Sequence, residues 1–234
     1  MGTGGIKRLV ALAIASAAVG CAGRGRMEEA GMSEGVRYLA LGDSYTIGEG
    51  VEAGERWPAR LAALLRARGI AVAEPEIVAR TGWTTDELDA AIDEAAPRGP
   101  YGLVSLLIGV NNQYRGGAES IYRTEFAALL HRAVGFAGGD ASRVVVLSIP
   151  DWSVTPFAEG RDRARIAHEV DAFNAAAREV TAELGARWVD VTPASREDGA
   201  DPAMLVADAL HPSGRQYAQW AELALPSAVA ALGH

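Results

Sequence analysis

Cysteine is nearly absent from this chain of 234 residues: Cys21 is the only one, so no disulfide can form within the molecule. Basic residues are also outnumbered, with 22 Lys and Arg against 30 Asp and Glu and a formal net charge of -8. Because the chain has no basic stripe of the kind that binds nucleic acid, we predict no nucleic-acid partner. It also has no cluster of His, Cys and carboxylates at metal-ligand spacing, so we expect neither a metal nor a cofactor.

Residues 1–20 have the pattern of an export signal. Lys7 and Arg8 precede an apolar run over 9–19, which ends in small residues. The run is too short to span a bilayer comfortably, and its basic flank and small-residue end are typical of a secretory signal peptide. We therefore exclude residues 1–20 from the folded domain.

Cys21 stands directly behind Ala18-Val19-Gly20. This arrangement resembles the lipobox of bacterial lipoproteins, where cleavage before cysteine leaves a residue that becomes lipid-modified, although that motif usually has leucine in place of Ala18. The resemblance implies a lipidated Cys21 and, with Ala22 rather than aspartate next, an outer-membrane destination in a Gram-negative cell. We expect an exported, membrane-anchored protein of the cell envelope, with a periplasmic or secreted protein as the alternative. Residues 21–35 would form a flexible tether with a mean span on the order of 20 Å.

The remaining residues, 36–234, alternate between two kinds of apolar pattern. Short apolar runs predict strands within 36–41, 70–79, 102–108, 143–149 and 187–191. Apolar residues at helical spacing predict helices over 58–68, 84–96, 120–137, 162–184 and 213–232. Capping boxes are expected where two of these helices begin, at Thr84 to Glu87 and at Ser213 to Gln216. The alternation predicts a single three-layer α/β/α domain with a five-stranded, mostly parallel sheet.

Several polar or glycine residues follow directly where these strands end. Ser44, in Gly42-Asp43-Ser44, follows the first strand, Gly82 follows the second and Asn111 follows the third. The carboxyl ends of parallel strands lie along one edge of a sheet, so we expect these residues to converge there. Asp208 and His211 lie in the loop before the last helix, which can return to the same edge.

The convergent residues supply each group that a serine needs to hydrolyse an ester. His211 can accept the proton of Ser44, and Asp208 can accept the other imidazole N–H. The backbone N–H groups of Ser44 and Gly82 and the side-chain amide of Asn111 can donate hydrogen bonds to the oxyanion. Each of these residues alone is an ordinary loop residue, and the hypothesis depends on their combination.

Asp190, where the fifth strand ends, is a competing candidate for the carboxylate that orients His211. It lies on the same predicted edge of the sheet as Ser44. Support of the local turn is its more natural role.

The four blocks around Ser44, Gly82, Asn111 and Asp208-x-x-His211 resemble those of the SGNH hydrolase superfamily, also called GDSL esterases and lipases. The resemblance covers essentially the whole chain after the tether. It implies a flavodoxin-like sheet and metal-independent ester hydrolysis through an acyl-enzyme. It also implies a triad and an oxyanion hole: Ser44, His211 and Asp208 as the triad, and Ser44, Gly82 and Asn111 as the hole.

The chain departs from this family at Asn112, where the third block usually has aspartate. The departure leaves the oxyanion donor Asn111 in place. It puts in doubt the contacts by which the usual aspartate holds the neighbouring residues. The Gly-x-Ser-x-Gly elbow of α/β-hydrolases is missing around Ser44, which disfavours that fold.

Five aromatic residues are expected in loops on the catalytic edge, where they could line an acyl slot, stack on a sugar ring or pack in the core: Tyr45, Trp57, Trp83, Tyr114 and Trp152. Three functions stay open at this point. The first is an esterase for short-chain, glycerolipid or lysophospholipid esters. The second is an envelope carbohydrate esterase or O-acyltransferase, and the third is a non-catalytic envelope binding protein.

Overall fold

Five short strands form one parallel sheet in the computed structural model, which describes residues 1–2 and 35–234. They are β1 (Tyr38–Gly42), β2 (Glu76–Ala79), β3 (Leu103–Leu107), β4 (Val144–Leu147) and β5 (Arg187–Val189). Their order, β2-β1-β3-β4-β5, is that of flavodoxin-like folds. Every neighbouring pair is parallel, which confirms the predicted sheet. Nearly all of the predicted signal peptide and tether, including Cys21, lies outside the described residues.

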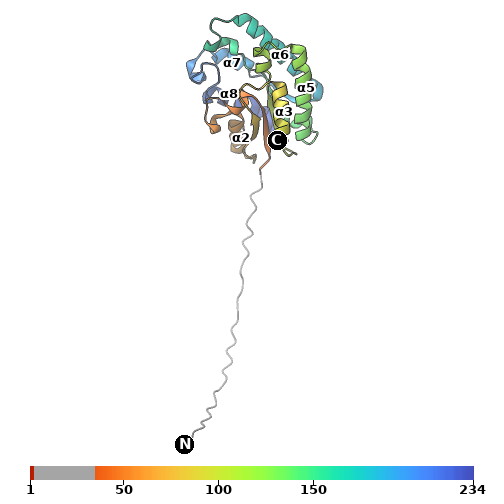
Figure 1. Cartoon of the computed structure of the whole chain (residues 1–234), viewed down its shortest axis with the longest axis vertical. Helices are drawn as coiled ribbons and strands as arrows, with labels where there is room; N and C mark the ends of the chain where they lie inside the picture. The colour runs from red at the N-terminus through yellow and green to blue at the C-terminus, as the bar shows by residue number, and fades with distance from the viewer. Residues whose placement is uncertain (3–34) are drawn as a thin grey trace. The chain divides into compact units, whose positions relative to one another are not determined.

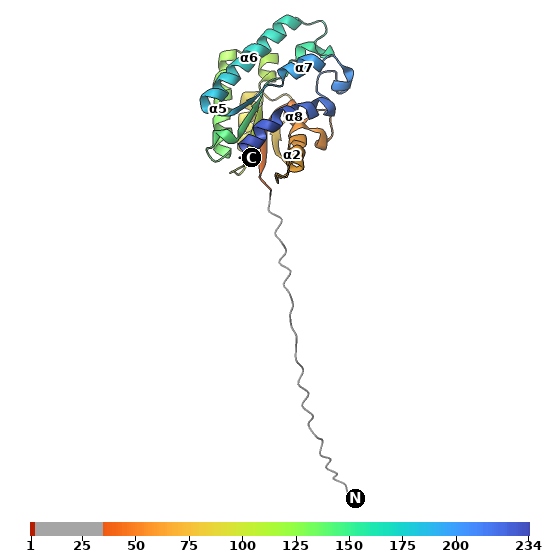
Figure 2. The ribbon, with the colours of Figure 1, turned by 180° about the vertical axis from the view of Figure 1, so that it is seen from behind.

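The central strands are apolar because both faces of the sheet are covered. Every residue of β1, β3 and β4 is buried, whereas the edge strands β2 and β5 are partly exposed. Helices α2 (Trp57–Ala67) and α8 (Gly214–Ala231) pack against each other on one face. Helices α3 (Thr85–Ala95), α5 (Glu119–Phe136) and α6 (Arg163–Leu184) cover the other face, as Figures 1 and 2 show. The predicted three-layer architecture is therefore confirmed.

Three short helices occupy segments that the sequence pattern leaves as turns or loops. They are α1 (Ser44–Ile47), α4 (Val110–Tyr114) and α7 (Thr192–Asp198). The first two are too short to show a helical period, and each follows a strand directly. In α7, Pro193 marks the end of the preceding strand and also suits the first turn of a helix. Residues 35–234 also contain five 3₁₀ turns: Ala53–Glu55, Ala141–Arg143, Trp152–Val154, Pro156–Ala158 and Pro202–Met204.

The two predicted capping boxes have different outcomes. The box before α3 is confirmed, because the carboxylate of Glu87 accepts the backbone N–H of Thr84 at 2.9 Å. The box before α8 is wrong. The hydroxyl of Ser213 donates instead to the carbonyl of Ala203 at 2.9 Å, so it holds the preceding loop and caps no amide of the helix.

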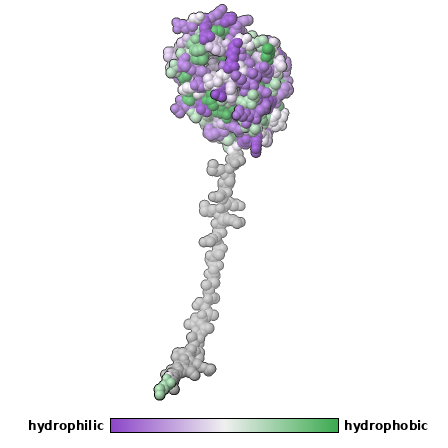
Figure 3. Space-filling model, viewed as in Figure 1, coloured by the Kyte–Doolittle hydropathy of each residue, from purple (hydrophilic) through white to green (hydrophobic). Residues whose placement is uncertain are grey.

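Hydrophilic side chains dominate the face of the domain drawn in Figure 3, where apolar residues appear in small scattered groups. The large apolar side chains lie inside instead, with Trp57 and Trp220 fully buried between α2, α8 and the sheet. Within residues 1–2 and 35–234, no helix combines the length and the apolar character needed to cross a bilayer.

Candidate active site

Ser44 lies where β1 ends, as the first residue of the short helix α1. The turn into this helix is tight: a Cβ on Gly42 would come within 2.2 Å of the Thr46 hydroxyl oxygen and 2.4 Å of the Leu107 carbonyl oxygen. Only glycine fits between β3 and α1 here. The backbone N–H of Ser44 is the first amide of α1, a position that has no acceptor within a helix. It is therefore suited to donate to a bound oxyanion.

Asp43 stabilises this turn from inside the domain. Its side chain is fully buried and accepts the backbone N–H of Tyr45 at 3.0 Å. Its second oxygen, Oδ2, has no hydrogen-bond partner among the described residues. Burial raises the pKa of Asp43 to about 7, against the smaller lowering effect of the hydrogen bond from Tyr45.

His211 and Asp208 form a hydrogen-bonded pair on the loop before α8. The Nδ1 atom of His211 lies 2.6 Å from Oδ2 of Asp208, and the backbone N–H groups of Leu210 and His211 both donate to Oδ1. Burial acts to raise the pKa of Asp208, but these hydrogen bonds outweigh it and hold the pKa below its ordinary value. The carboxylate therefore stays ionised and keeps the proton of neutral His211 on Nδ1, which leaves Nε2 free to accept one.

Two of the predicted oxyanion donors, Gly82 and Asn111, belong to residues held by hydrogen bonds with their neighbours. Gly82 has a φ of +91°, a backbone conformation that glycine adopts easily, and its carbonyl accepts the Arg115 guanidinium at 2.7 Å. Arg115 also forms an ion pair with Glu87 at 3.2 Å. The side-chain amide of Asn111 donates one N–H to the carbonyl of Trp83 at 2.9 Å. A primary amide has a second N–H, so Asn111 retains a donor for the oxyanion.

Asn112, where the chain departs from the SGNH pattern that it resembles, binds the same loop through Thr85. Its Oδ1 accepts the backbone N–H of Thr85 at 3.1 Å, which fixes the amide orientation, and its Nδ2 donates to the hydroxyl oxygen of Thr85 at 2.7 Å. The hydroxyl proton of Thr85 goes to the carboxylate of Glu125 on α5. Residue 112 must therefore donate to this hydroxyl, which an asparagine does and an ionised aspartate cannot do. Glu125 thus gives a physical reason for the asparagine.

One apolar cleft of about 210 Å³ connects these residues. Ser44, Gly82, Asn111 and His211 all lie along its wall. Asp208 lies behind His211 and does not line the cleft. The structure therefore brings the sequence-predicted residues together, and their catalytic roles stay predictions.

The aromatic residues of the cleft agree only in part with the sequence-based expectation. Tyr45, Tyr114 and Trp152 line it. Trp57, the first residue of α2, is fully buried, and Trp83 packs against the core, so neither belongs to the cleft wall. Four further lining residues, Thr81, Val110, Phe157 and Leu210, were not predicted from the sequence, because they lie in loops or in helical turns too short to show a periodic pattern.

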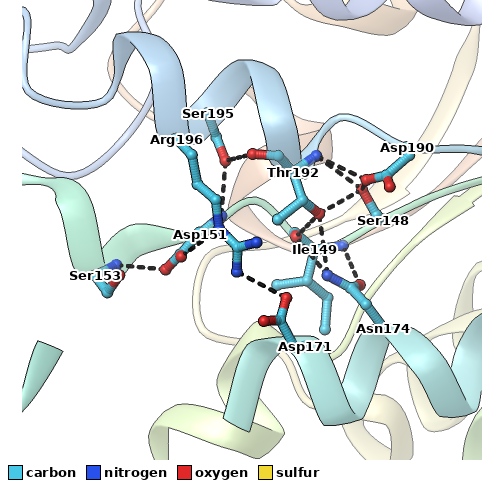
Figure 4. A network of polar contacts seen from close by, with 10 residues as sticks. All are labelled: Ser148, Ile149, Asp151, Ser153, Asp171, Asn174, Asp190, Thr192, Ser195 and Arg196. Atoms are coloured by element: carbon cyan, nitrogen blue, oxygen red, sulfur yellow. Dashed lines mark hydrogen bonds and ion pairs between the residues drawn. The ribbon is translucent and has the colours of Figure 1, made fainter. Parts of the chain in front are cut away.

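Trp152 is held in place from two directions. Its indole N–H donates to the buried Gln113 side chain at 2.9 Å. Its chain neighbours Asp151 and Ser153 belong to the polar network of Figure 4, which holds the loop after β4: Asn174 on α6 forms two hydrogen bonds with the backbone of Ile149, of 2.8 and 2.9 Å. The buried Asp151 carboxylate accepts the Arg196 guanidinium at 2.8 Å. These contacts hold the loop that carries Trp152 against α6 and α7.

Asp190 belongs to this network and not to the triad. Its carboxylate accepts the Ser148 hydroxyl at 3.0 Å and the backbone N–H of Thr192 at 3.1 Å (Figure 4). It lines a separate hollow with Asp171 and Asn174. The geometry therefore favours Asp208 as the partner of His211, and Asp190 supports the turn into α7.

A flavodoxin-like sheet with a serine at the first strand end, and a hydrogen-bonded His–Asp pair on the last loop, is the arrangement expected of a serine ester hydrolase. The model of the GDSL-like lipase/acylhydrolase family matches residues 40–219. The chain belongs to this family, which confirms the resemblance to the SGNH hydrolases. It is a carboxylic ester hydrolase, so the non-catalytic alternative is not supported. No curated protein matches the sequence.

Solved structures share the fold at low sequence identity. The structure of TesA has 21% identity and a TM-score of 0.66, with 84% of this chain and 99% of that chain covered. A lipase/acylhydrolase from Enterococcus faecalis has 22% identity and a TM-score of 0.63, with 82% of this chain and 94% of that chain covered. Axe2, an acetylxylan esterase from Geobacillus stearothermophilus, has 19% identity and a TM-score of 0.61, with 87% of this chain and 97% of that chain covered.

Proposed function

We propose that this protein hydrolyses esters of short to medium acyl chains through an acyl-enzyme on Ser44. The observation that carries the proposal is that Ser44, Asn111 and His211 line one and the same apolar cleft. Its volume is about 210 Å³. At roughly 30 Å³ per water-sized group, this holds about seven such groups. An acetyl to hexanoyl chain fits within it, whereas a long fatty-acyl chain would extend into solvent.

The geometry supports a two-step mechanism. Ser44 Oγ attacks the acyl carbonyl carbon while His211 Nε2 takes its proton, and Asp208 holds the imidazole that becomes positively charged. The N–H groups of Ser44, Gly82 and Asn111 receive the negative charge that develops on the carbonyl oxygen. Collapse of this intermediate releases the alcohol, which takes the proton from His211. Water then attacks the acyl-enzyme with His211 as base, releases the acid and restores Ser44.

A series of 4-nitrophenyl esters from acetate to palmitate tests this proposal on the purified full chain. We expect kcat/KM to be highest among the short and medium chains and to fall beyond the chain length that fills the cleft. Ser44→Ala is the matched control and should remove turnover of every member. Highest activity on the longest esters would contradict the assignment of chain length.

A carbohydrate ester is the second candidate substrate, and it is favoured by the aromatic wall. Tyr114 is 47% exposed and lies edge-to-face against Trp152, with ring centroids 5.5 Å apart. An exposed aromatic ring beside the catalytic serine can stack on a sugar. Acetylated xylo-oligosaccharides should then be cleaved with a higher kcat/KM than 4-nitrophenyl acetate, and Tyr114→Ala should remove that preference. Equal loss on both substrates would refute a role in sugar binding.

We also propose that the domain is exported and anchored to a membrane through a lipid on Cys21. The support is the sequence pattern over residues 7–21, which lies outside the described residues. Mass spectrometry of the protein extracted from bacterial membranes should show acyl chains on an N-terminal Cys21. The Cys21→Ser variant should be unmodified and released. A soluble wild-type protein with unmodified Cys21 would refute the anchor.

A further inference from the structure

Arg161 lies at a point where two hollows meet. The catalytic cleft is bounded by Tyr114 and Trp152, and the same two residues bound an adjoining polar hollow of about 250 Å³. Arg161 lines this second hollow, on the turn just before α6. A substrate whose ester lies at Ser44 and whose far end passes Tyr114 would therefore reach Arg161.

The guanidinium of Arg161 is held by aromatic rings and not by an acid. Its central carbon lies 5.0 Å from the ring centroid of Phe157, 5.3 Å from that of Tyr114 and 5.5 Å from that of Trp152. It also donates to the Tyr114 hydroxyl at 3.3 Å. Within residues 35–234, no carboxylate lies within salt-bridge distance of it. The rings fix the position of the cation and leave its charge without an ionic partner.

The other cation of this hollow, Arg165, differs in this respect. It lies 3.8 Å from Glu169, one turn further along α6, and its side chain is largely exposed. Glu169 in turn accepts the amide of Gln113, so it is fixed in the wall. Arg165 is therefore already compensated, and Arg161 is the cation available to an anion entering from the cleft.

We propose that Arg161 forms an anion subsite and that the preferred esters carry a terminal carboxylate or phosphate group. This proposal rests on the ester hydrolase activity proposed above. The protein has a formal net charge of -8 and repels anions at long range, so an anionic substrate needs a local cation of this kind. A planar guanidinium binds both carboxylate and phosphate through paired N–H donors.

The test compares pairs of esters of matched shape. On the acyl side, mono(4-nitrophenyl) adipate is paired with 4-nitrophenyl 6-methylheptanoate, in which an isopropyl group replaces the carboxylate. On the alcohol side, 1-octanoylglycerol 3-phosphate is paired with 1-octanoylglycerol. We expect Arg161→Gln to lower kcat/KM for the anionic member of at least one pair by roughly 10-fold, mainly through KM, and to change its neutral partner less than about twofold.

The pair that responds identifies the side of the ester that carries the anion. Arg161→Lys should restore part of the preference, and added salt should weaken it in the wild type. Arg165→Gln is the matched control, since it removes one positive charge from the same hollow and should leave both pairs unchanged. Equal losses on the anionic and neutral members in Arg161→Gln would show that Arg161 only supports the aromatic wall, and no loss on either would also overturn the proposal. Hydrolysis of the neutral esters by the wild type tests the esterase assignment separately.

Discussion

Replacing Asn112 with aspartate tests how the loop that carries Gly82 is held. In the wild type, Thr85 donates its hydroxyl proton to Glu125 and accepts an N–H from Asn112. An aspartate at position 112 would still accept the backbone N–H of Thr85, but it has no proton for the hydroxyl oxygen. Two carboxylates would then compete for one hydroxyl proton, and we expect Asn112→Asp to destabilise the domain.

The size of this effect follows from the distance between the two carboxylates. Both reach the same hydroxyl oxygen, so their oxygens would lie roughly 5 Å apart. Two unit charges at about 5 Å repel by about 3 kcal/mol at an effective dielectric constant of about 20. Since Asn112 and Glu125 are both partly exposed, we expect about 2 kcal/mol. For a domain of this size, that loss lowers Tm by about 4–8 °C.

A second substitution should reverse the effect. With Glu125→Gln, the new amide can donate to the Thr85 hydroxyl, whose own proton is then free for the aspartate introduced at position 112. The double variant should recover most of the lost stability, and Glu125→Gln alone should cost less than about 1 kcal/mol. Urea unfolding of the four proteins gives the coupling free energy directly. Additive effects, with the double variant no more stable than Asn112→Asp, would refute this account of the hydrogen bonds.

Three further predictions concern the cleft and its support. Asn111→Ala should lower kcat for 4-nitrophenyl acetate by roughly 10²-fold through loss of an oxyanion donor, and an unchanged kcat would remove Asn111 from the site. Asp208→Asn should lower kcat by roughly 10³-fold or more by changing the tautomer of His211, whereas Asp190→Asn should have little effect; similar losses in the two variants would contradict the choice of Asp208. The third prediction concerns Asp43, whose raised pKa, about 7 when folded, means that the folded state binds more protons than the unfolded chain between about pH 4 and pH 7. Stability should therefore fall by up to about 4 kcal/mol as the pH rises through this range and level off above it. Urea unfolding across the range should show a flatter profile for Asp43→Asn, and parallel profiles would refute the assignment.

The sequence predicts the layers, the parallel sheet and the convergence of strand ends, because these depend on patterns that recur over many residues. Five apolar runs separated by helical periods leave few alternatives for a chain of this length. The hydrogen-bonded pair of Asp208 and His211 is also foreseeable, since three residues of separation place both on one turn. Short helices such as α4 escape detection because five residues are too few for a helical period.

Contacts between side chains from different helices, strands or loops are harder to predict from the sequence. Trp57 and Trp152 both look like loop aromatics, but the first is buried at the start of α2 and the second lines the cleft. The role of Asn112 depends on Glu125, which lies on another helix and has no recognisable motif. The position of the Arg161 guanidinium likewise depends on three aromatic rings, those of Tyr114, Trp152 and Phe157, which no sequence pattern brings together.

Covalent labelling of the nucleophile tests the central claim most directly. The purified full chain is treated with a fluorophosphonate, which reacts with an activated serine, and the modified peptide is located by mass spectrometry. We expect one phosphonyl group per molecule, on Ser44, with parallel loss of esterase activity. His211→Ala should react far more slowly, because Ser44 then lacks its base. Labelling of a different residue, or full esterase activity in Ser44→Ala, would contradict the account.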